Sequence, residues 1–488
     1  MRSLVTIAGV GQLTQRPDNP EDALEPVAMM TEAVRRAAED AGSSRLAEAA
    51  DAIAVARGAW RYSDPGRLVA DAVGAKRART LLTSHGGNTP QSLVNHFAQL
   101  IADGQMDVGI VVGAEAIHSR GRLRALGHDI EKTTQTDVEP DEHFGSDSPM
   151  GSEAEQSRGV AMPIQFYPIF ENALRAARGE TIDQQRDRLA RLWARFNEVA
   201  VANPYAWSRR PMTAEQIREA TPENRMVGFP YTKAMNSNWF LDQAAAVIVC
   251  SPEAAKGLGV AADRLVFLHA GTDAHDTYLV SNRLELHSSP AIRIAGRRVL
   301  ELAGVGVDDL DHVDLYSCFP SAVQIAATEI GLPLDRQLTV TGGLTFAGGP
   351  LNNYVTHSIA TMVDVLRNDA GSTGLVSANG GFLTKHAFGV YSTSPPAEGF
   401  SYADVQSEVD ATGQREFAGD FEGPVTIESN TVMFGKEGPD VGLFACRLDD
   451  GRRAWGNTTD ADTMQLMTTE ETIGRPAKLT ANGTVELA

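Results

Sequence analysis

Three side chains in the second half of the chain belong to types that do acid, base or nucleophilic chemistry. The stretch "DLYSCFP" holds a phenol, Tyr316, and a thiol, Cys318, and the stretch "NGGFLTKH" ends on an imidazole, His386. Phenols and imidazoles can serve as general bases, and a thiol can serve as a nucleophile. The candidate catalytic residues are therefore Tyr316 and His386 as bases and Cys318 as a nucleophile. Each also has a structural interpretation: a packed aromatic ring, an exposed loop residue beside Lys385, and an inert buried thiol.

A second set of residues could hold the oxygen of a ligand. Glycine turns that precede helices present backbone amides, and such amides stabilise an anion or a polarised carbonyl. One of these turns, "TFAGGPLNNY", carries no acid, base or nucleophile, and the next polar side chains are Asn352 and Asn353. The candidate substrate or oxyanion residues are Asn88, Gly87, Gly349, Gly380, Gly381 and Lys385.

An internal repeat indicates the elements that position these residues. The segment "GGNTPQSLVNHFAQLIADGQMDVGIVVGAEA" from Gly86 and the segment "GGPLNNYVTHSIATMVDVLRNDAGSTGLVSANGG" from Gly348 share one order: a glycine pair, an amphipathic helix and a buried strand. In the first copy Thr89 is the expected N-cap and Pro90 the first helical residue. A repeat of this length predicts two similar α/β halves, each a sheet covered by helices.

Two further segments lack this repeat. The first lies between the halves and contains "RLARLWARF", where Leu189, Leu192, Trp193 and Phe196 form an apolar stripe on a predicted helix. The second follows the repeat and alternates β-rich runs with "KEGPD" and "DDG" turns, which predicts a small antiparallel barrel packed on the rest of the chain. The predicted domains are 1–118 (first half), 119–238 (insertion), 239–400 (second half) and 410–488 (β-rich C-terminal domain).

Composition limits the partners and the compartment. The net charge of −20 disfavours nucleic acid and anionic membranes, and no apolar run is long enough to span a bilayer. Cys250, Cys318 and Cys446 lie far apart, so neither a disulfide framework nor a zinc site is encoded. A cytoplasmic protein is expected, since the N-terminal run is interrupted by Gly9 and Gly11 and predicts a first strand rather than a signal peptide.

The order of these motifs resembles the thiolase superfamily, and within it the sterol-carrier-type thiolases and their thiolase-like relatives. "ALEPVAMMTEAVRRAAEDAG" is similar to the first helix of that fold, "SHGGNTPQSLVNHF" to its nucleophile region, and "MNSNWFLDQAAAVIVC" to the start of its second half. "DLYSCFPSAVQIA", "TGGLTFAGGPLNNY" and "GLVSANGGFLTKHAFG" fall where the three later catalytic motifs belong. The resemblance implies a thiolase fold with a loop domain inserted between two pseudo-symmetric α/β halves. It also implies a coenzyme A thioester as substrate or ligand with no other cofactor. A homodimer is the usual assembly of the family, and a monomer stays open because the added domain could cover that interface.

The family's catalytic residues are missing. The nucleophilic cysteine would fall on Asn88 or, with a shift of one residue, on Gly87, and the histidine of the Gly-His-Pro motif would fall on Gly349. The second cysteine would fall on Ser377 or Ala378. Loss of a nucleophile together with its base leaves only a trace of activity in comparable enzymes, so acyl transfer through a covalent intermediate is not expected.

Three functions remain open. The first is an enzyme that makes or breaks a carbon–carbon bond next to an acyl thioester without an acyl-enzyme. Retro-aldolases of the thiolase fold, which also lack the cysteine and work with an OB-fold partner protein, provide the analogy, with a tyrosine as base. The second is a non-catalytic acyl-CoA-binding or regulatory module of lipid metabolism. The third is an acetyl-CoA acetyltransferase with a relocated nucleophile, Cys318.

Overall fold

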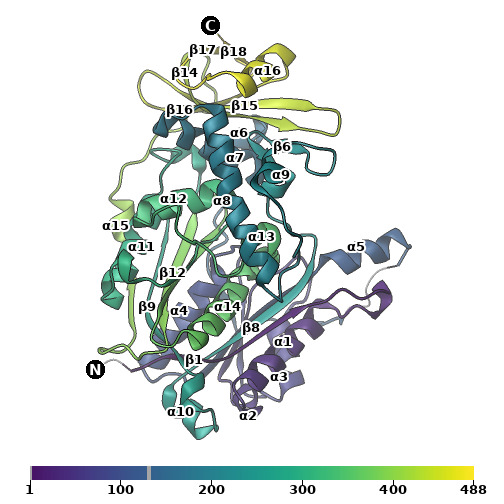
Figure 1. The fold of residues 1–488 in the computed structure, drawn as a ribbon, viewed down its shortest axis with the longest axis vertical. Coiled ribbons are helices and arrows are strands. Elements are labelled where there is room, and N and C mark those ends of the chain that lie inside the picture. The colour runs from purple at the N-terminus through teal and green to yellow at the C-terminus, as the bar shows by residue number, and fades with distance from the viewer. Residues whose placement is uncertain (1–2, 129–132, 488) are drawn as a thin grey trace.

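A long mixed sheet forms the centre of the protein (Figure 1). The structure, a computed structural model, describes residues 3–128 and 133–487. The strands follow one another in the order β10-β11-β12-β9-β1-β8-β4-β2-β3-β5, and β13 pairs with β9. Their bounds are β1 Thr6–Thr14, β2 Ala52–Val55, β3 Arg79–Thr83, β4 Val108–Ala116, β5 Glu142–Phe144, β8 Asp242–Cys250, β9 Val266–His275, β10 His312–Asp314, β11 Thr373–Gly380, β12 Lys385–Ser392 and β13 Ser401–Asp404.

The strand order confirms the predicted pair of α/β halves. Outward from the central pair, β1-β8-β4-β2 on one side repeats as β9-β12-β11-β10 on the other. The pairing senses repeat as well: β8 is antiparallel to β1 and β4, and β2 is parallel to β4. Likewise, β12 is antiparallel to β9 and β11, and β10 is parallel to β11. The halves meet where Thr6 and Ile7 of β1 pair with Phe267 and Val266 of β9.

The boundary between the halves lies later in the chain than predicted. The run "DQAAAVIVC", which was expected to open the second half, forms β8 and lies between β1 and β4 in the sheet of the first half. All residues of β8 are buried, so its composition indicates a central strand but not which strands it pairs with. The second half begins with β9.

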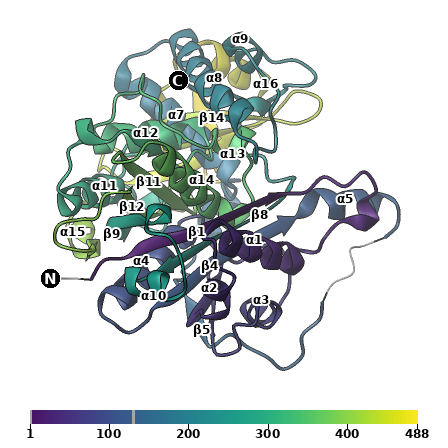
Figure 2. The ribbon, with the colours of Figure 1, turned by 60° about the horizontal axis from the view of Figure 1, so that its bottom comes forward.

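Two buried helices, α4 and α14, connect the halves. Both contact strands of both halves as well as each other, and most of their residues are buried. Asn88 is the N-cap residue of α4, one position before the predicted Thr89, and its side chain makes no capping hydrogen bond. Other helices cover the outer faces; Figure 2 shows α1, α2 and α3 along the first half. The helices of the two halves are α1 Pro26–Asp40, α2 Arg45–Glu48, α3 Pro65–Val73, α4 Thr89–Ala102, α5 Ile117–Ala125, α10 Pro252–Gly257, α11 Pro290–Ala303, α12 Pro320–Ile330, α13 Gly343–Phe346, α14 Tyr354–Asn368 and α15 Gln406–Asp410.

The insertion supplies a helical layer next to the second half. Its longest helix, α8, is the one predicted from "RLARLWARF", and its apolar stripe of Leu189, Leu192, Trp193 and Phe196 is buried as expected. The preceding helix, α7, carries Phe166 and Tyr167 into the core. The elements of the insertion are α6 Glu153–Ser157, α7 Pro163–Arg178, α8 Ile182–Ala202, α9 Ala214–Arg218, β6 Met226–Gly228 and β7 Tyr231–Thr232.

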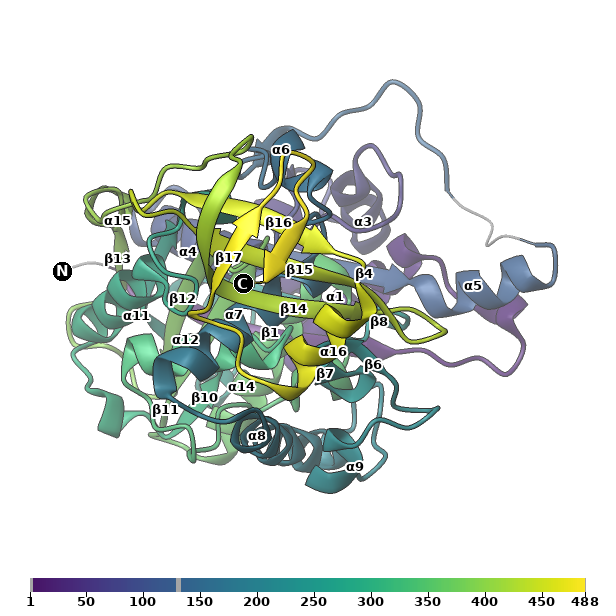
Figure 3. The same cartoon turned by 90° about the horizontal axis from the view of Figure 1, so that it is seen from above.

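The C-terminal segment forms a curled antiparallel sheet that lies across α7 (Figure 3). Its strand order is β16-β15-β14-β17-β18, and the N–H of Asn457 in β16 donates to the Gly483 carbonyl next to β18 (2.9 Å), which draws the two edges together. β6 of the insertion extends the sheet beside β14. The predicted packed β-rich domain is thus confirmed. Its elements are β14 Gly423–Phe434, β15 Pro439–Arg447, β16 Arg453–Thr458, α16 Ala461–Thr469, β17 Pro476–Leu479 and β18 Val485–Leu487.

Two further features concern possible partners. The short strand β5 pairs in parallel with β3 and covers the edge of the first half's sheet. Within residues 3–128 and 133–487, no helix combines the length and apolar character that a membrane span needs.

Candidate functional site

The chain ends of several central elements surround a cavity of about 680 Å³. Its lining comes from the turn before α4, the start of α7, the loop after β10, the turn before α14 and the end of β11. Apolar side chains form much of the wall. The lining includes His85, Gly86, Gly87, Met162, Pro163, Ile164, Tyr167, Trp239, Tyr316, Cys318, Phe319, Leu344, Gly349, Leu351, Asn352, Asn379, Gly380, Gly381 and Phe382.

The hydroxyl of Tyr316 occupies the space that a side chain at position 87 would need. A Cβ atom added to Gly87 would lie 2.2 Å from Tyr316 Oη and 2.6 Å from the carbonyl oxygen of Asn379. The phenol ring is held edge-on to Tyr354, with ring centroids 5.4 Å apart. The backbone N–H of Tyr316 donates to Ser377 Oγ (2.9 Å). Gly87 and Tyr316 are therefore complementary in shape. Because Gly87 has no side chain, the Tyr316 hydroxyl can lie at the start of α4.

Tyr316 is suited to donate a hydrogen bond rather than to take a proton. Burial, and then the neighbouring Cys318, raise the pKa of Tyr316 well above its ordinary value, so the phenol stays protonated near pH 7. The hydrogen bonds found among the described residues include none that uses its hydroxyl, and the residue lines the cavity. A ligand oxygen in the cavity can accept this hydrogen bond.

Cys318 lines the same cavity as a protonated thiol. Burial raises the pKa of Cys318 to about 12, and Asn379 Nδ2 donates to its sulfur (3.6 Å). The thiolate is the nucleophilic form of cysteine, so this environment does not activate Cys318. The interpretation as an unreactive buried thiol fits the structure better than that of a relocated nucleophile.

The four predicted glycines also line the cavity, and they differ in the amides they offer. The N–H of Gly349 already donates to the Asn238 carbonyl (2.8 Å), so it is not available to a ligand. Gly87 and Gly381 have no backbone acceptor for their N–H groups within the described part of the chain. These two amides and the Tyr316 hydroxyl are therefore candidate donors to a ligand in the cavity.

Asn88 and Lys385 lie behind this wall. Both line a separate pocket of about 260 Å³, and neither lines the main cavity. Asn88 Nδ2 donates to Ser92 Oγ (3.3 Å), while Lys385 Nζ donates to the carbonyl oxygens of His85 (2.7 Å) and Ser146 (3.1 Å). Lys385 therefore supports the turn before α4 rather than reaching the cavity.

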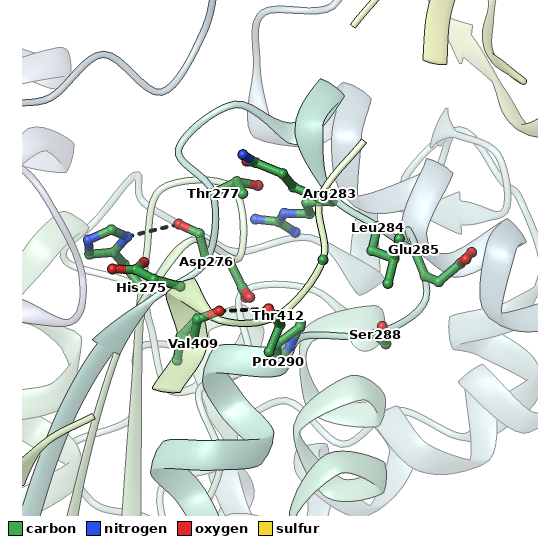
Figure 4. A pocket seen from close by; sticks show the side chains of 13 residues that line it. His275, Asp276, Thr277, Arg283, Leu284, Glu285, Ser288, Pro290, Val409 and Thr412 are labelled. Carbon is green, nitrogen blue, oxygen red and sulfur yellow. Dashed lines mark hydrogen bonds between the residues drawn. The ribbon is translucent and has the colours of Figure 1, made fainter. Parts of the chain in front are cut away.

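His386 also points away from the cavity. Its buried ring lies next to Asp276, with 3.6 Å between Nε2 and Oδ2, and Nε2 is 3.3 Å from the Leu383 carbonyl oxygen. Asp276 lines a different pocket, shown in Figure 4 together with Arg283. His386 is paired with Asn379 of β11, so both side chains start from the same face of the sheet, but Asn379 lines the main cavity while the His386 ring lies next to Asp276. We therefore assign His386 no contact with a ligand in the main cavity.

Sequence reasoning missed His85 and gave no role to Asn352, and both line the main cavity. His85 Nδ1 lies 3.3 Å from Asn352 Nδ2, although 267 positions separate them. The Asn352 amide is oriented by the Gly86 N–H, which donates to its Oδ1 (3.1 Å), and by its own Nδ2, which donates to the Arg57 carbonyl (2.7 Å). His85 Nδ1 therefore accepts, and the neutral ring carries its proton on Nε2. The only signal in the sequence is the place of His85 directly before the glycine pair in "SHGG".

The charge state of His85 follows from its neighbours. Partial burial, and then the charges of Arg57 and Lys385, lower the pKa of His85, while Asp147 opposes them. The imidazole is thus neutral at pH 7 and offers Nε2–H as a donor. Among the residues described, no group of three or more His, Cys, Asp or Glu side chains is arranged to hold a metal ion.

Comparison with known proteins places the chain in a family. A family model described as the thiolase-like protein type 1 additional C-terminal domain matches residues 404–484. A solved structure of a monomeric SCP2-thiolase like protein type 1 from Mycobacterium smegmatis is 31% identical, with 99% of each chain covered and a TM-score of 0.84. The chain belongs to the thiolase-like protein type 1 family. The family assignment covers both the two-halved body and the additional C-terminal domain of this thiolase-like protein.

Two more distant relatives share only the fold or a part of the sequence with this chain. The structure described as an Ltp2-ChsH2(DUF35) aldolase is 18% identical to this thiolase-like protein, covers 80% of it and 97% of the other chain, and has a TM-score of 0.61, which shows a shared fold alone. An acetyl-CoA acetyltransferase from Methanocaldococcus jannaschii is 29% identical over 136 residues, or 28% of this chain. That match spans about a third (33%) of the length of the curated relative.

Proposed function

We propose that this thiolase-like protein binds acyl-CoA thioesters in the main cavity and forms no covalent acyl-enzyme. The thiolase-like fold and the similarity to acetyl-CoA acetyltransferases support a coenzyme A thioester as the ligand. The cavity, of about 680 Å³, is large enough for an acyl group and lies where the central helices α4 and α14 begin.

A single observation carries the proposal. At Gly87, one of the two positions on which the family's nucleophile would fall, the hydroxyl of Tyr316 fills the space of a side chain, and a Cβ there would lie 2.2 Å from it. The nearest thiol, Cys318, is protonated because burial raises its pKa to about 12. A bound thioester therefore meets a hydrogen-bond donor where a covalent enzyme would present its nucleophile.

The remaining lining residues suit the thioester carbonyl and the acyl chain of such a ligand. The thioester carbonyl can accept from Tyr316 and from the amides of Gly87 and Gly381, as oxyanion sites do. The acyl chain can pack against the apolar wall that Phe319 and Phe382 help to form.

Calorimetric titration with acetyl-CoA and with longer acyl-CoAs tests the proposal. We expect dissociation constants between about 1 μM and 1 mM, and Tyr316→Phe should weaken binding about tenfold, since a hydrogen bond to a ligand carbonyl is lost. Intact mass measurement after incubation should show no acyl adduct on the wild type. A stoichiometric adduct, or heat too small to detect at millimolar ligand, would overturn the proposal.

The geometry of His85 and Tyr316 favours one second candidate, cleavage of a 3-hydroxyacyl thioester between its α and β carbons. One group must take the hydroxyl proton as the bond breaks, and another must protonate the enolate that leaves with the thioester. His85 could accept through Nδ1 by giving up its long contact with Asn352 (3.3 Å), and Tyr316 stays protonated because its pKa is raised. Release of an aldehyde or ketone from a 3-hydroxyacyl-CoA, lost in His85→Gln, would establish this activity, and its absence would leave the binding function alone.

A further inference from the structure

The additional C-terminal domain contacts the thiolase body through a completely buried arginine. Arg453 of β16 donates from Nη1 to the carbonyl oxygens of Val280 (3.2 Å), Ser281 (3.0 Å) and Arg283 (2.6 Å). Its charge is balanced within its own domain by Glu428, at 2.7 Å from Nε and 2.6 Å from Nη2. Because all three nitrogens of Arg453 are engaged, the backbone of residues 280–283 is fixed relative to the C-terminal domain.

That segment in turn holds a loop of the main cavity. Arg283, which is 4% exposed, donates from Nη2 to the carbonyl oxygens of Phe382 (2.7 Å) and Leu383 (2.6 Å), and it lies 3.2 Å from Thr384 Oγ1. Figure 4 shows Arg283 among the residues of the neighbouring pocket, next to Asp276. Phe382 lines the main cavity together with the preceding Gly381. Arg283 is thus the link between the domain junction and the cavity wall.

A second, apolar connection ends on the same loop. Trp455, two residues after Arg453, donates from Nε1 to Ser281 Oγ (2.8 Å). Its ring meets Phe166 of α7 edge-on, with centroids 5.8 Å apart, and Phe166 packs on Phe382 at 4.5 Å. Both Trp455 and Phe166 are buried. The polar and apolar routes therefore converge on Phe382.

The loop needs such support because its backbone is strained. Leu383 has φ +60°, a left-handed conformation that costs a non-glycine residue energy unless its surroundings hold it. Its carbonyl accepts from Arg283, and its N–H donates to Tyr167 Oη (2.9 Å). Loss of the Arg283 contact leaves the Leu383 carbonyl with only the longer contact to His386 Nε2 (3.3 Å), and the loop can then relax away from the cavity.

We propose that the C-terminal domain is a positioning element of the ligand cavity: Arg453 and Trp455 hold residues 280–283, through which Arg283 fixes the loop 380–384 at the cavity wall. None of these residues needs to touch the ligand except Phe382, Gly380 and Gly381. The inference rests on the proposed function, because it takes the main cavity as the ligand site.

Hydrogen exchange on the full-length protein tests the positioning without any ligand. In Arg453→Met and in Arg283→Lys, the amides of residues 380–384 should exchange at least about tenfold faster than in the wild type. Arg283→Lys removes the guanidinium that bonds the loop carbonyls, and Arg453→Met releases the segment 280–283 that carries Arg283. Trp455→Phe, which keeps an aromatic ring but removes the indole N–H, should give a smaller change in the same peptide. Should Arg453→Met fail to fold, Arg283→Lys and Trp455→Phe decide the question.

A matched control comes from another contact between the same two parts. Glu471 of the C-terminal domain forms a two-pronged ion pair with Arg175 of α7, with both N–O distances 3.0 Å, and the contact does not involve residues 280–283. Glu471→Gln loosens the junction but should leave loop exchange within about twofold of the wild type. The proposal is overturned if the loop behaves the same in Arg453→Met and Glu471→Gln.

Ligand affinity gives the second measurement. Titration with the acyl-CoA that binds the wild type should show a loss of about tenfold in Arg453→Met and Arg283→Lys, and little loss in Glu471→Gln. A wild type that binds no acyl-CoA would defeat the proposed function, and loop exchange would then still decide whether the domain positions the cavity wall. Unchanged affinity together with unchanged exchange would contradict the positioning role.

Discussion

Replacing Gly87 by alanine tests whether the Tyr316 hydroxyl fills the side-chain space at position 87. The added Cβ would lie 2.2 Å from Tyr316 Oη, 2.8 Å from Tyr316 Cζ and 2.6 Å from the Asn379 carbonyl oxygen. Ordinary contact begins near 3.4 Å, so the phenol must shift by about 1.2 Å and the carbonyl by about 0.8 Å. The ring of Tyr316 packs edge-on against Tyr354, which opposes a shift on that side.

The size of the effect follows from the packing. Overfilling a packed site costs about 1–3 kcal/mol, and the upper end applies here because a backbone carbonyl must move as well as a side chain. We expect Gly87→Ala to lower the free energy of unfolding by about 3 kcal/mol in urea denaturation and to abolish acyl-CoA binding. Tyr316→Phe removes the closest atom, so the double variant should recover at least about 1 kcal/mol relative to additivity.

Gly257 provides the control glycine. No atom lies within 4 Å of a Cβ added there, so Gly257→Ala should leave stability and binding close to those of the wild type. Wild-type stability and wild-type affinity in Gly87→Ala would refute the assigned position of Tyr316. Additive effects in the double variant would show that the clash lies elsewhere.

Three further predictions concern chemistry, pH and assembly. Acetoacetyl-CoA with free coenzyme A should give no thiolysis above background, because Cys318 is protonated; turnover that Cys318→Ala abolishes would contradict this. Burial raises the pKa of Glu115 to about 7 from 4.5, so its contribution to stability is complete below pH 4.5 and is lost as the pH rises through about 7. Glu115→Gln should therefore raise the free energy of unfolding at pH 8 by up to about 3 kcal/mol and change little at pH 4; equal gains at both pH values would rule out this origin. Because β5 covers the edge of β3, the protein should be a monomer in light scattering, and a dimer that resists dilution would show that another surface pairs.

Local patterns in the sequence determined the elements and their order. Amphipathic spacing predicted α4, α8 and α14, and glycine-bounded apolar runs predicted the buried strands β4 and β11, all of which the structure contains. These signals are reliable because the periodicity of a helix or strand is a property of neighbouring residues. The order of the motifs then indicated the family and the missing catalytic groups.

The tertiary structure alone decided which elements pair and which side chains share a cavity. In a fully buried strand such as β8, polar and apolar residues do not alternate, so the sequence does not indicate which strands it pairs with. Its place between β1 and β4 was therefore not predictable. The same holds for the site: His85 meets Asn352, and Gly87 meets Tyr316, only after the two halves pack. His386, which the sequence offered as a base, lies next to Asp276 instead, a residue directly after β9 that only the folded sheet brings beside β12. Contacts between distant residues are set by the packing of whole elements, and no local pattern encodes them.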